Sequence, residues 1–284
     1  MKNLLTIDIG GSSIKYADFS LEGQLLSKNS FEVPKSFDEL LDKIKKLFQK
    51  GDYDGISISS PGAIDSKTGK GYGISAIDYI PCGGNLKEEL EKSLNISIAI
   101  DNDANCAALS EIHFSKDLNS IAYLVLGSGV GGAVIIDGKV VSGSSFFAGE
   151  FGYIPYKDST YSGYAGMLGL SKHASHQKEE VISGLEIFKN YDLKIEEYVT
   201  AVNEYYEALA SLLSVIKYTF NPEKIILSGA ITNRSTFLEE LQEATKLFEK
   251  DKDYQISDIP LSISQFTSDA NLYGAYANLI RNYF

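Results

Sequence analysis

The fold is indicated first by a stretch near the start of the chain, LLTIDIGGSSIKYADF (residues 4–19). Residues 4–9 form an apolar run typical of a buried strand, and residues 14–19 alternate well enough to be its antiparallel partner. A turn at residues 21–24 leads into a third strand over residues 24–33. The stretch therefore predicts a β-meander whose first turn is built on two glycines.

Helices and strands alternate after this meander. Apolar residues at helical spacing predict a helix over residues 36–49, with Ser36 as its N-cap and Glu39 three residues on. Strands at 53–58 and 96–100 follow, and a helix over 104–113 begins directly after the second of them. This alternation places the chain in the α/β class.

A second meander is predicted over residues 121–141. Its strands lie at 121–126, 132–136 and 139–141, and Asp137-Gly138 is the hairpin turn between the last two. The architecture of the first meander recurs here without its residues, which suggests two halves of like design.

The rest of the chain is mostly helical. Residues 157–189 are polar and show no clear period, whereas 195–220 predict a long helix that Pro222 terminates. A strand at 224–227, a helix over 236–250, a strand at 261–264 and a closing helix over 270–282 complete the prediction.

Composition limits the class of function. The net charge of −12 argues against a nucleic-acid or anionic-membrane partner and favours small-molecule chemistry. Cys82 and Cys106 are too few for a disulfide framework or a Cys-rich zinc site, so no structural zinc is expected. No run of about 18 apolar residues occurs. We expect a cytoplasmic protein.

Two glycine turns could hold phosphate groups. Asp8 precedes Gly10-Gly11-Ser12, and a second turn spans Gly127 to Gly132 with the sequence GSGVGG. Glycine lets backbone N–H groups approach phosphate oxygens, and Asp8 would hold Mg²⁺ through water. Each turn alone is equally well explained as a plain hairpin. Together they favour a nucleotide, because a triphosphate clamped by two domains needs a cradle on each.

The segment Asp101-Asn102-Asp103-Ala104-Asn105 joins a predicted strand to a predicted helix. Ligands bind at the carboxyl ends of such strands, and phosphoryl transfer to an alcohol needs a carboxylate that accepts the hydroxyl proton. Asp103 is the candidate base. The alternative is N-capping by Asn102 or Asp103, although a cap needs only one such residue.

Three further segments are weaker candidates. Glu150 lies between glycines and could accept hydrogen bonds from sugar hydroxyls, Gly229-Ala230 follows a strand where a flat ring could rest, and Gly62 lies in a turn with accessible N–H groups. An ordinary turn explains each of them equally well in isolation.

Together these segments resemble the ROK family of sugar kinases over nearly the whole chain. The motifs that carry the resemblance are DIGGS with Lys15, SPGAID at 60–65, NDANCAALSE at 102–111, the glycines of 127–132 with IDG at 136–138, NPE at 221–223 with GAI at 229–231, and NLYGA at 271–275. Most members carry a His after Gly-Glu-x-Gly and a zinc-binding Cys loop. Here Tyr153 replaces the His and the loop is missing between Lys157 and Lys172, so the chain resembles the zinc-free branch with bacterial N-acetylmannosamine and β-glucoside kinases.

The resemblance implies a two-domain actin-like ATPase fold (ribonuclease H-like), each domain a mixed sheet flanked by helices, with the active site in the interdomain cleft. The smaller domain would comprise residues 1–112 with the closing helix 268–284, and the larger one residues 113–267. The implied activity is ATP- and Mg²⁺-dependent phosphorylation of a hexose hydroxyl, most often O6, with glucose, an N-acylhexosamine such as N-acetylmannosamine, or a β-glucoside as substrate. A homodimer is expected, as is common among relatives.

The alternative is a sugar-binding or sugar-sensing protein without catalysis. A repressor needs an N-terminal helix-turn-helix, for which a phosphate strand starting at residue 4 leaves no room.

The resemblance also implies roles for single residues. Asp103 would be the catalytic base. The sugar would be bound by Gly62, Asn102, Asp103, Glu150 and Tyr153. ATP and its phosphates would be bound by Asp8, Gly10, Gly11, Ser12, Lys15, Gly127, Ser128, Gly129, Gly131, Gly229 and Ala230.

Overall fold

The computed structural model describes residues 3–73, 75, 77–82, 84–115, 117–175, 181–252 and 255–284. The chain forms two compact units. Unit 1 comprises Met1–Asp117, Ser142–Ala148 and Gln265–Phe284, and unit 2 comprises Leu118–Val141 and Gly149–Ser264. The short segment Ser142–Ala148 therefore packs with unit 1, although the chain on either side of it belongs to unit 2.

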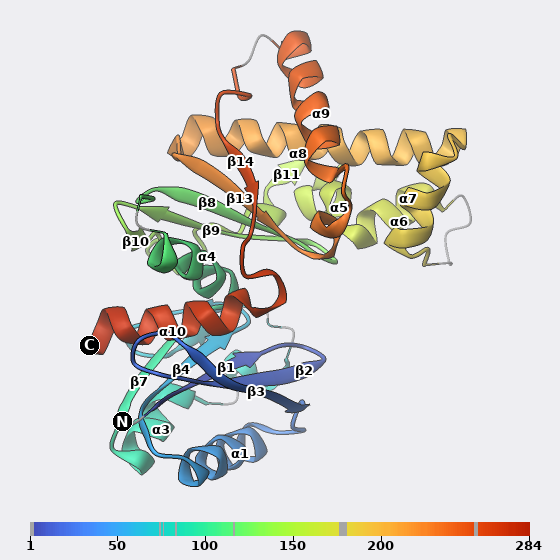
Figure 1. Cartoon of the computed structure of the whole chain (residues 1–284). Coiled ribbons are helices and arrows are strands. Elements are labelled where there is room, and N and C mark those ends of the chain that lie inside the picture. Colours follow the sequence, from blue (N-terminus) through green and yellow to red (C-terminus); the bar gives the residue numbers. More distant parts are fainter. Residues whose placement is uncertain are drawn as a thin grey trace. The chain divides into compact units, whose positions relative to one another are not determined.

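Unit 1 is built on a five-stranded sheet (Figure 1). Its strand order is β3 (Leu25–Glu32), β2 (Ser13–Phe19), β1 (Asn3–Ile9), β4 (Tyr53–Ser60) and β7 (Ser97–Asn102). The first three strands are antiparallel neighbours, and β1, β4 and β7 run parallel. Residues 4–9 of β1 are all buried, as expected of a central strand covered on both faces.

Helices cover both faces of this sheet. They are α1 (Phe37–Lys50), α2 (Tyr79–Cys82), α3 (Leu86–Leu94), α4 (Asp103–Phe114), η3 (Thr267–Asp269) and α10 (Ala270–Tyr283). On one face Leu40 of α1 and Leu90 of α3 pack against Ile7, and on the other face Leu279 of α10 packs against Leu4. A small hairpin, β5 (Ala63–Ile64) with β6 (Gly71–Tyr72), follows β4.

The α4–α10 packing depends on a glycine. A Cβ atom at Gly274 of α10 would lie 1.6 Å from the carbonyl oxygen of Cys106 in α4, so the two backbones approach too closely for any side chain. The helix that begins at Asp103 is thereby held directly against the closing helix (Figure 1).

Unit 2 repeats the strand order of unit 1. Its sheet runs β10 (Lys139–Val140), β9 (Val130–Ile136), β8 (Ile121–Leu126), β13 (Lys224–Ser228) and β14 (Leu261–Ile263). Again the first three strands are antiparallel and the last three parallel. The prediction of two halves of like design is confirmed at the level of topology.

The core of unit 2 lies between its sheet and α8 (Glu196–Phe220), which carries Leu209, Leu213 and Ile216 toward it. The other elements are η1 (Phe151–Tyr153), β11 (Pro155–Tyr156), β12 (Ser159–Thr160), α5 (Tyr161–Ala165), α6 (Met167–Ala174), α7 (Gly184–Asp192), η2 (Ala230–Asn233) and α9 (Phe237–Lys252). Short helices thus occupy much of the segment that had no clear sequence pattern. Over the described ranges, no helix is both long and apolar enough to cross a membrane.

Candidate active site

Asp8 lies near the carboxyl end of β1 and is buried. Its Oδ1 accepts hydrogen bonds from Ser59 Oγ (3.2 Å) and Asn271 Nδ2 (2.9 Å), and Lys15 Nζ lies 3.9 Å from its Oδ2. Burial raises the pKa of this carboxyl, while the hydrogen bond from Asn271 opposes the rise. Asp8 is therefore held in place through one oxygen, and the other faces a cation.

The first glycine turn joins β1 to β2. Gly10 N donates to Ser13 O over 3.2 Å, and Gly11 and Ser12 are exposed at the tip. Lys15 lies one register position from this turn, opposite Asp8, and its Nζ donates to Ser268 O. Glycine backbone, a hydroxyl and a lysine are thus brought together with Asp8.

The acidic segment at the end of β7 forms a closed set of hydrogen bonds. Asn102 is the N-cap of α4, and its Oδ1 accepts from Asn105 N over 3.1 Å. The carboxyl of Asp101, which is buried, accepts from Asn102 N (2.7 Å) and from Asn105 Nδ2 (2.8 Å). Burial raises the pKa of Asp101 to about 6. The capping interpretation is thus correct for Asn102, and Asp101 secures the cap.

Asp103 is the first residue of α4 and is partly buried. Its Oδ1 accepts from Ala104 N over 2.8 Å. Burial raises the pKa of Asp103 to about 6, the bond from Ala104 opposes the rise, and the negative charge of Asp8 adds to it. Asp103 is therefore a carboxyl that loses its proton close to neutral pH, as suits a general base.

The turn after β4 reaches the same helix end. Gly62 has φ +91°, a conformation that favours glycine, and its carbonyl oxygen accepts from Asn102 Nδ2 over 3.0 Å. Both ends of the Asn102 amide therefore have partners within unit 1. Gly62, Asn102 and Asp103 therefore lie close together in unit 1.

The second glycine turn, in unit 2, joins β8 to β9. Gly127 N donates to Gly129 O, and the carbonyls of Gly127 and Ser128 accept from Met167 N and Leu168 N at the start of α6. Ser162 Oγ accepts from Val130 N and would lie 3.0 Å from a Cβ atom on Gly129. Contacts from α5 and α6 thus hold this turn in place.

The turn is shorter than the sequence suggested. Gly131 lies inside β9, where it pairs with Val125 of β8, so the strand begins at Val130 and not at Gly132. The reason is that the antiparallel ladder of β8 continues to its last residue, Leu126. Gly131, which was predicted to bind phosphate, is therefore a paired residue of β9 and not part of the turn.

Gly229 and Ala230 follow β13. Gly229 has φ +111°, and a Cβ atom there would lie 2.0 Å from Leu126 O, the residue before the glycine turn. Glycine is required here both by its backbone angle and by the close approach. It joins the ends of two neighbouring strands, β8 and β13, at one edge of the sheet.

A pocket of about 780 Å³ opens beside Ala230 within unit 2. Its volume lies in the range of small-ligand sites, and much of its wall is apolar. The lining side chains come from α6, α7 and the η2 region and include Met167, Leu185, Phe188, Leu193, Ala230, Ile231 and Arg234. Of this set, Ala230 alone was predicted from the sequence to bind a ligand, and Ile231 belongs to the same GAI motif.

Arg234 fixes one wall of the pocket. Its guanidinium pairs with Asp192 and with Glu240, each at 2.6 Å, and lies 5.1 Å from the ring centre of Phe188. These contacts connect the end of α7 with η2 and α9. The only sequence signal was an arginine shortly after Gly229, in a chain with few arginines.

Glu150 precedes η1 in unit 2, and Tyr153 is the last residue of η1. Glu150 is the N-cap residue of η1, and Tyr153 N donates to its carbonyl oxygen over 3.2 Å. The Tyr153 side chain is 69% exposed. Both therefore lie in one turn, where they were predicted, and neither lies in the pocket beside Ala230.

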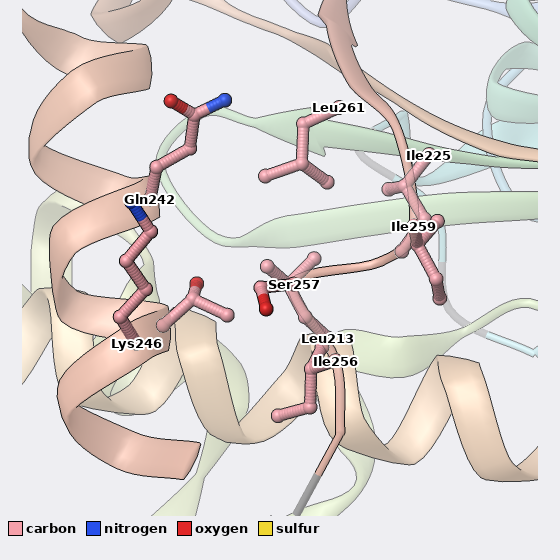
Figure 2. A pocket seen from close by; sticks show the side chains of 9 residues that line it. Leu213, Ile225, Gln242, Lys246, Ile256, Ser257, Ile259 and Leu261 are labelled. Carbon is pink, nitrogen blue, oxygen red and sulfur yellow. The ribbon is translucent and has the colours of Figure 1, made fainter. Parts of the chain in front are cut away.

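A second pocket of unit 2 measures about 240 Å³ (Figure 2). Figure 2 shows Leu213 of α8, Gln242 and Lys246 of α9 and Ile225 of β13 around it, with the segment before β14 closing one side. This volume is below the usual size of a small-ligand site. We assign it no role.

The fold and the site together define a class of protein, an α/β protein of two topologically alike halves. In one half the central strands lead to a buried acidic cluster, and in the other they lead to glycine turns beside a pocket. A sequence model of the ROK family matches residues 4–281, so the chain belongs to the ROK family. The expectations of this family and of an α/β fold with mixed sheets flanked by helices are confirmed.

Relatives of known name agree with this assignment. A beta-glucoside kinase of Listeria monocytogenes is 34% identical over 86% of this chain and 88% of its own. An N-acetyl-D-glucosamine kinase of Photobacterium profundum is 29% identical over 82% of this chain and 86% of its own. The crystal structure of a ROK family protein from Streptococcus pneumoniae TIGR4 in complex with sucrose superposes with a TM-score of 0.90 at 30% identity, covering 98% of each chain.

Proposed function

We propose that the protein is a sugar kinase that transfers the γ-phosphoryl group of ATP to a hexose hydroxyl, with O6 as the favoured acceptor. The observation that carries the proposal is the state of Asp103, a carboxyl with a pKa of about 6 at the N-terminus of α4, beside Asp8. The relatives named as kinases of β-glucosides and of N-acetylglucosamine support the class of reaction.

In the proposed reaction Asp103 accepts the proton of the sugar hydroxyl. The hydroxyl oxygen forms a bond to the γ-phosphorus, the bond from that phosphorus to the β–γ bridging oxygen breaks, and ADP leaves with the electron pair. The N-terminus of α4, whose first N–H groups point toward the strand end, favours the negative charge of Asp103. The cap of Asn102 and the buried carboxyl of Asp101 fix this helix end.

The sugar is proposed to contact Gly62, Asn102 and Asp103 in unit 1 and Glu150 and Tyr153 in unit 2. The amide of Asn102 uses one N–H in its bond to Gly62 O and one lone pair for Asn105 N, so a second N–H and a second lone pair remain for the sugar. Tyr153 is exposed enough to reach a ligand.

The nucleotide is proposed to bind through both glycine turns and the pocket of unit 2. Gly10, Gly11, Ser12 and Lys15 would contact phosphates from unit 1, and Gly127 to Gly129 from unit 2. The adenine would lie against Gly229 and Ala230 in the pocket of about 780 Å³. An apolar wall with a stacked guanidinium suits a flat heterocycle.

Mg²⁺ is proposed to bind with the phosphates near Asp8. The residues fit, because Asp8 is a buried carboxylate with one oxygen held by Ser59 and Asn271, while Lys15 Nζ lies 3.9 Å from the other oxygen. Mg²⁺ usually keeps several waters and takes one or two protein carboxylates together with phosphate oxygens. When bound it would neutralise charge on the phosphates. We place the enzyme in the cytoplasm, where ATP is supplied, and propose a homodimer, to be checked by light scattering.

The test is a coupled ADP-release screen of the purified protein against some twenty sugars, with Asp103→Asn as the matched variant. We expect at least one hexose or hexoside to stimulate ADP release. The rate of the variant should be lower than that of wild type by a factor of roughly 10² to 10⁴. A sugar that binds without stimulating ADP release would favour the non-catalytic sugar-binding alternative. A variant that keeps more than a few per cent of the rate would remove Asp103 as the base.

A further inference from the structure

A group of aromatic side chains in unit 1 takes no part in the proposed chemistry. The rings of Tyr72 and Phe146 stack with their centres 5.4 Å apart and their planes within 19°. Phe147 is 45% exposed, and Lys70 Nζ lies 5.2 Å from the centre of the Tyr72 ring. Three aromatic rings and a cation thus gather at one place on the surface of this unit.

These rings come from distant parts of the sequence, and the local backbone conformation brings them into contact. Phe146 adopts φ +66°, which is uncommon for a non-glycine residue, and Ala148 N closes a turn by donating to Ser142 O. On the other side Gly73 lies so close to Phe147 that a Cβ atom would sit 2.8 Å from its ring. This is why the segment Ser142–Ala148 belongs to unit 1.

The group lies next to the proposed sugar site. Tyr72 of β6 is the direct partner of Ala63 in β5, and Ala63 follows Gly62. Gly62 O accepts from Asn102, the neighbour of Asp103. One strand pair and one hydrogen bond therefore separate the aromatic group from the proposed base, all within unit 1.

The exposure of Phe147 argues against a purely structural role. Aromatic rings that only stabilise a core are buried, whereas an exposed ring beside a stacked pair offers an apolar face to a ligand. The C–H face of a pyranose or an aryl ring suits such a surface, and Lys70 at its rim can donate hydrogen bonds to hydroxyls. The geometry fits a ring attached to the sugar being phosphorylated.

We propose that Tyr72, Phe146 and Phe147 form an aromatic subsite that binds the second ring of a glycoside whose first ring is the phosphoryl acceptor. The inference rests on the proposed function and narrows the substrate to two-ring glycosides, either disaccharides or aryl glycosides. Phe147 is the main contact, because it is the most exposed of the three.

The test compares one-ring and two-ring acceptors in the purified full chain. For wild type we expect higher kcat/KM with cellobiose or phenyl β-D-glucoside than with glucose. Phe147→Ala should lower kcat/KM for the two-ring acceptors roughly three- to tenfold more than for glucose, through KM and not kcat. Phe147→Leu keeps the bulk that packs on Gly73 but lacks the ring, and should show the same selective loss.

Phe284→Ala is the matched control, because Phe284 is also an exposed phenylalanine of unit 1, 61% against the 45% of Phe147, and lies at the end of the chain. It should leave the ratio of two-ring to one-ring acceptors unchanged. A wild-type preference for glucose, an equal loss for both acceptor types, or a Phe147→Leu variant that behaves as wild type would overturn the subsite.

A failure of the proposed function is seen separately. If no sugar stimulates ADP release, calorimetric binding of phenyl β-D-glucoside to wild type and to Phe147→Ala still decides the subsite. Weaker binding to the variant supports it, and equal binding or no binding to wild type contradicts it.

Discussion

The two units share one strand order and differ in what their central strands end in. In unit 1, Asp8 is the next-to-last residue of β1, β7 ends in Asp101-Asn102, and Asp103 follows. In unit 2, β8 and β13 end beside Gly127 and Gly229. The comparison shows that one scaffold can present side-chain acids in one half and bare backbone in the other.

This difference has an energetic side. In unit 1, burial raises the pKa of Asp101 and of Asp103 to about 6, and the charge of Asp8 adds to the rise at Asp103. This costs stability but produces a base near neutral pH. In unit 2, close backbone contacts such as that of Gly229 with Leu126 exclude side chains and leave N–H groups for anions. We infer that proton transfer belongs to unit 1 and that unit 2 mainly holds the nucleotide.

The largest effect in this comparison is expected from Asp8→Asn. The substitution keeps the hydrogen bond that Asp8 accepts from Asn271 but removes the charge proposed to hold Mg²⁺. We expect kcat to fall roughly 10²- to 10³-fold, as for loss of one preorganised electrostatic group. Steady-state kinetics across a Mg²⁺ titration measure it. An unchanged Mg²⁺ dependence would remove Asp8 from the metal site.

A smaller effect is expected from Gly229→Ala in unit 2. The Cβ atom would meet Leu126 O at 2.0 Å and the residue has φ +111°, so the turn must shift. Strain of about 1–3 kcal/mol corresponds to roughly five- to 150-fold weaker ATP binding. Gly131→Ala is the control, since Gly131 lies in the paired strand β9 and a Cβ atom there would meet Val125 Cβ at an ordinary 3.7 Å. If sugar KM rises as much as ATP KM, the division between the units is wrong.

The pH dependence tests unit 1 alone. Because the pKa of Asp103 is raised to about 6 and the base must be deprotonated, kcat/KM should fall about tenfold per unit as pH drops below 6. Asp8 contributes to the raised pKa of Asp103. In the residual activity of Asp8→Asn, the acidic limb of the pH profile, where kcat/KM falls, should therefore move to lower pH. A limb that stays in place would show that Asp8 does not act on the titrating group.

The smallest effect is expected from Ser162→Ala, which removes the acceptor that holds Val130 N beside the second glycine turn. A hydrogen bond worth about 1 kcal/mol corresponds to roughly fivefold higher KM for ATP with little change in kcat. Ser211→Ala, at a hydroxyl that contacts Tyr161 in the same unit, is the control. Equal effects of the two variants would mean that only general stability had changed.

Local patterns made much of the fold predictable. The run at residues 4–9, the first glycine turn and the long helix ended by Pro222 depend on contacts close in sequence, and they appear where expected. Topological likeness of the halves could be predicted for the same reason. The family and the class of kinase followed from the order of the motifs, which agrees with the relatives.

The rest depends on contacts distant in sequence. Arg234 has no motif, and its place beside Phe188 arises only because Asp192 and Glu240 pair with it. Residues 161–174 form two short helices held by tertiary contacts, such as the stack of Tyr156 on Tyr161 at 4.9 Å. Likewise, no sequence periodicity predicts the stacking of Phe146 on Tyr72.

The most direct test of this division of labour is the affinity of Asp103→Asn for a non-hydrolysable ATP analogue, measured by calorimetry beside wild type. Asp103 belongs to unit 1 and is assigned no contact with the nucleotide. We predict that the variant, which has lost phosphoryl transfer, binds the analogue within about twofold of wild type. An affinity that falls in parallel with the rate would contradict the account, because Asp103 would then serve nucleotide binding and not proton transfer.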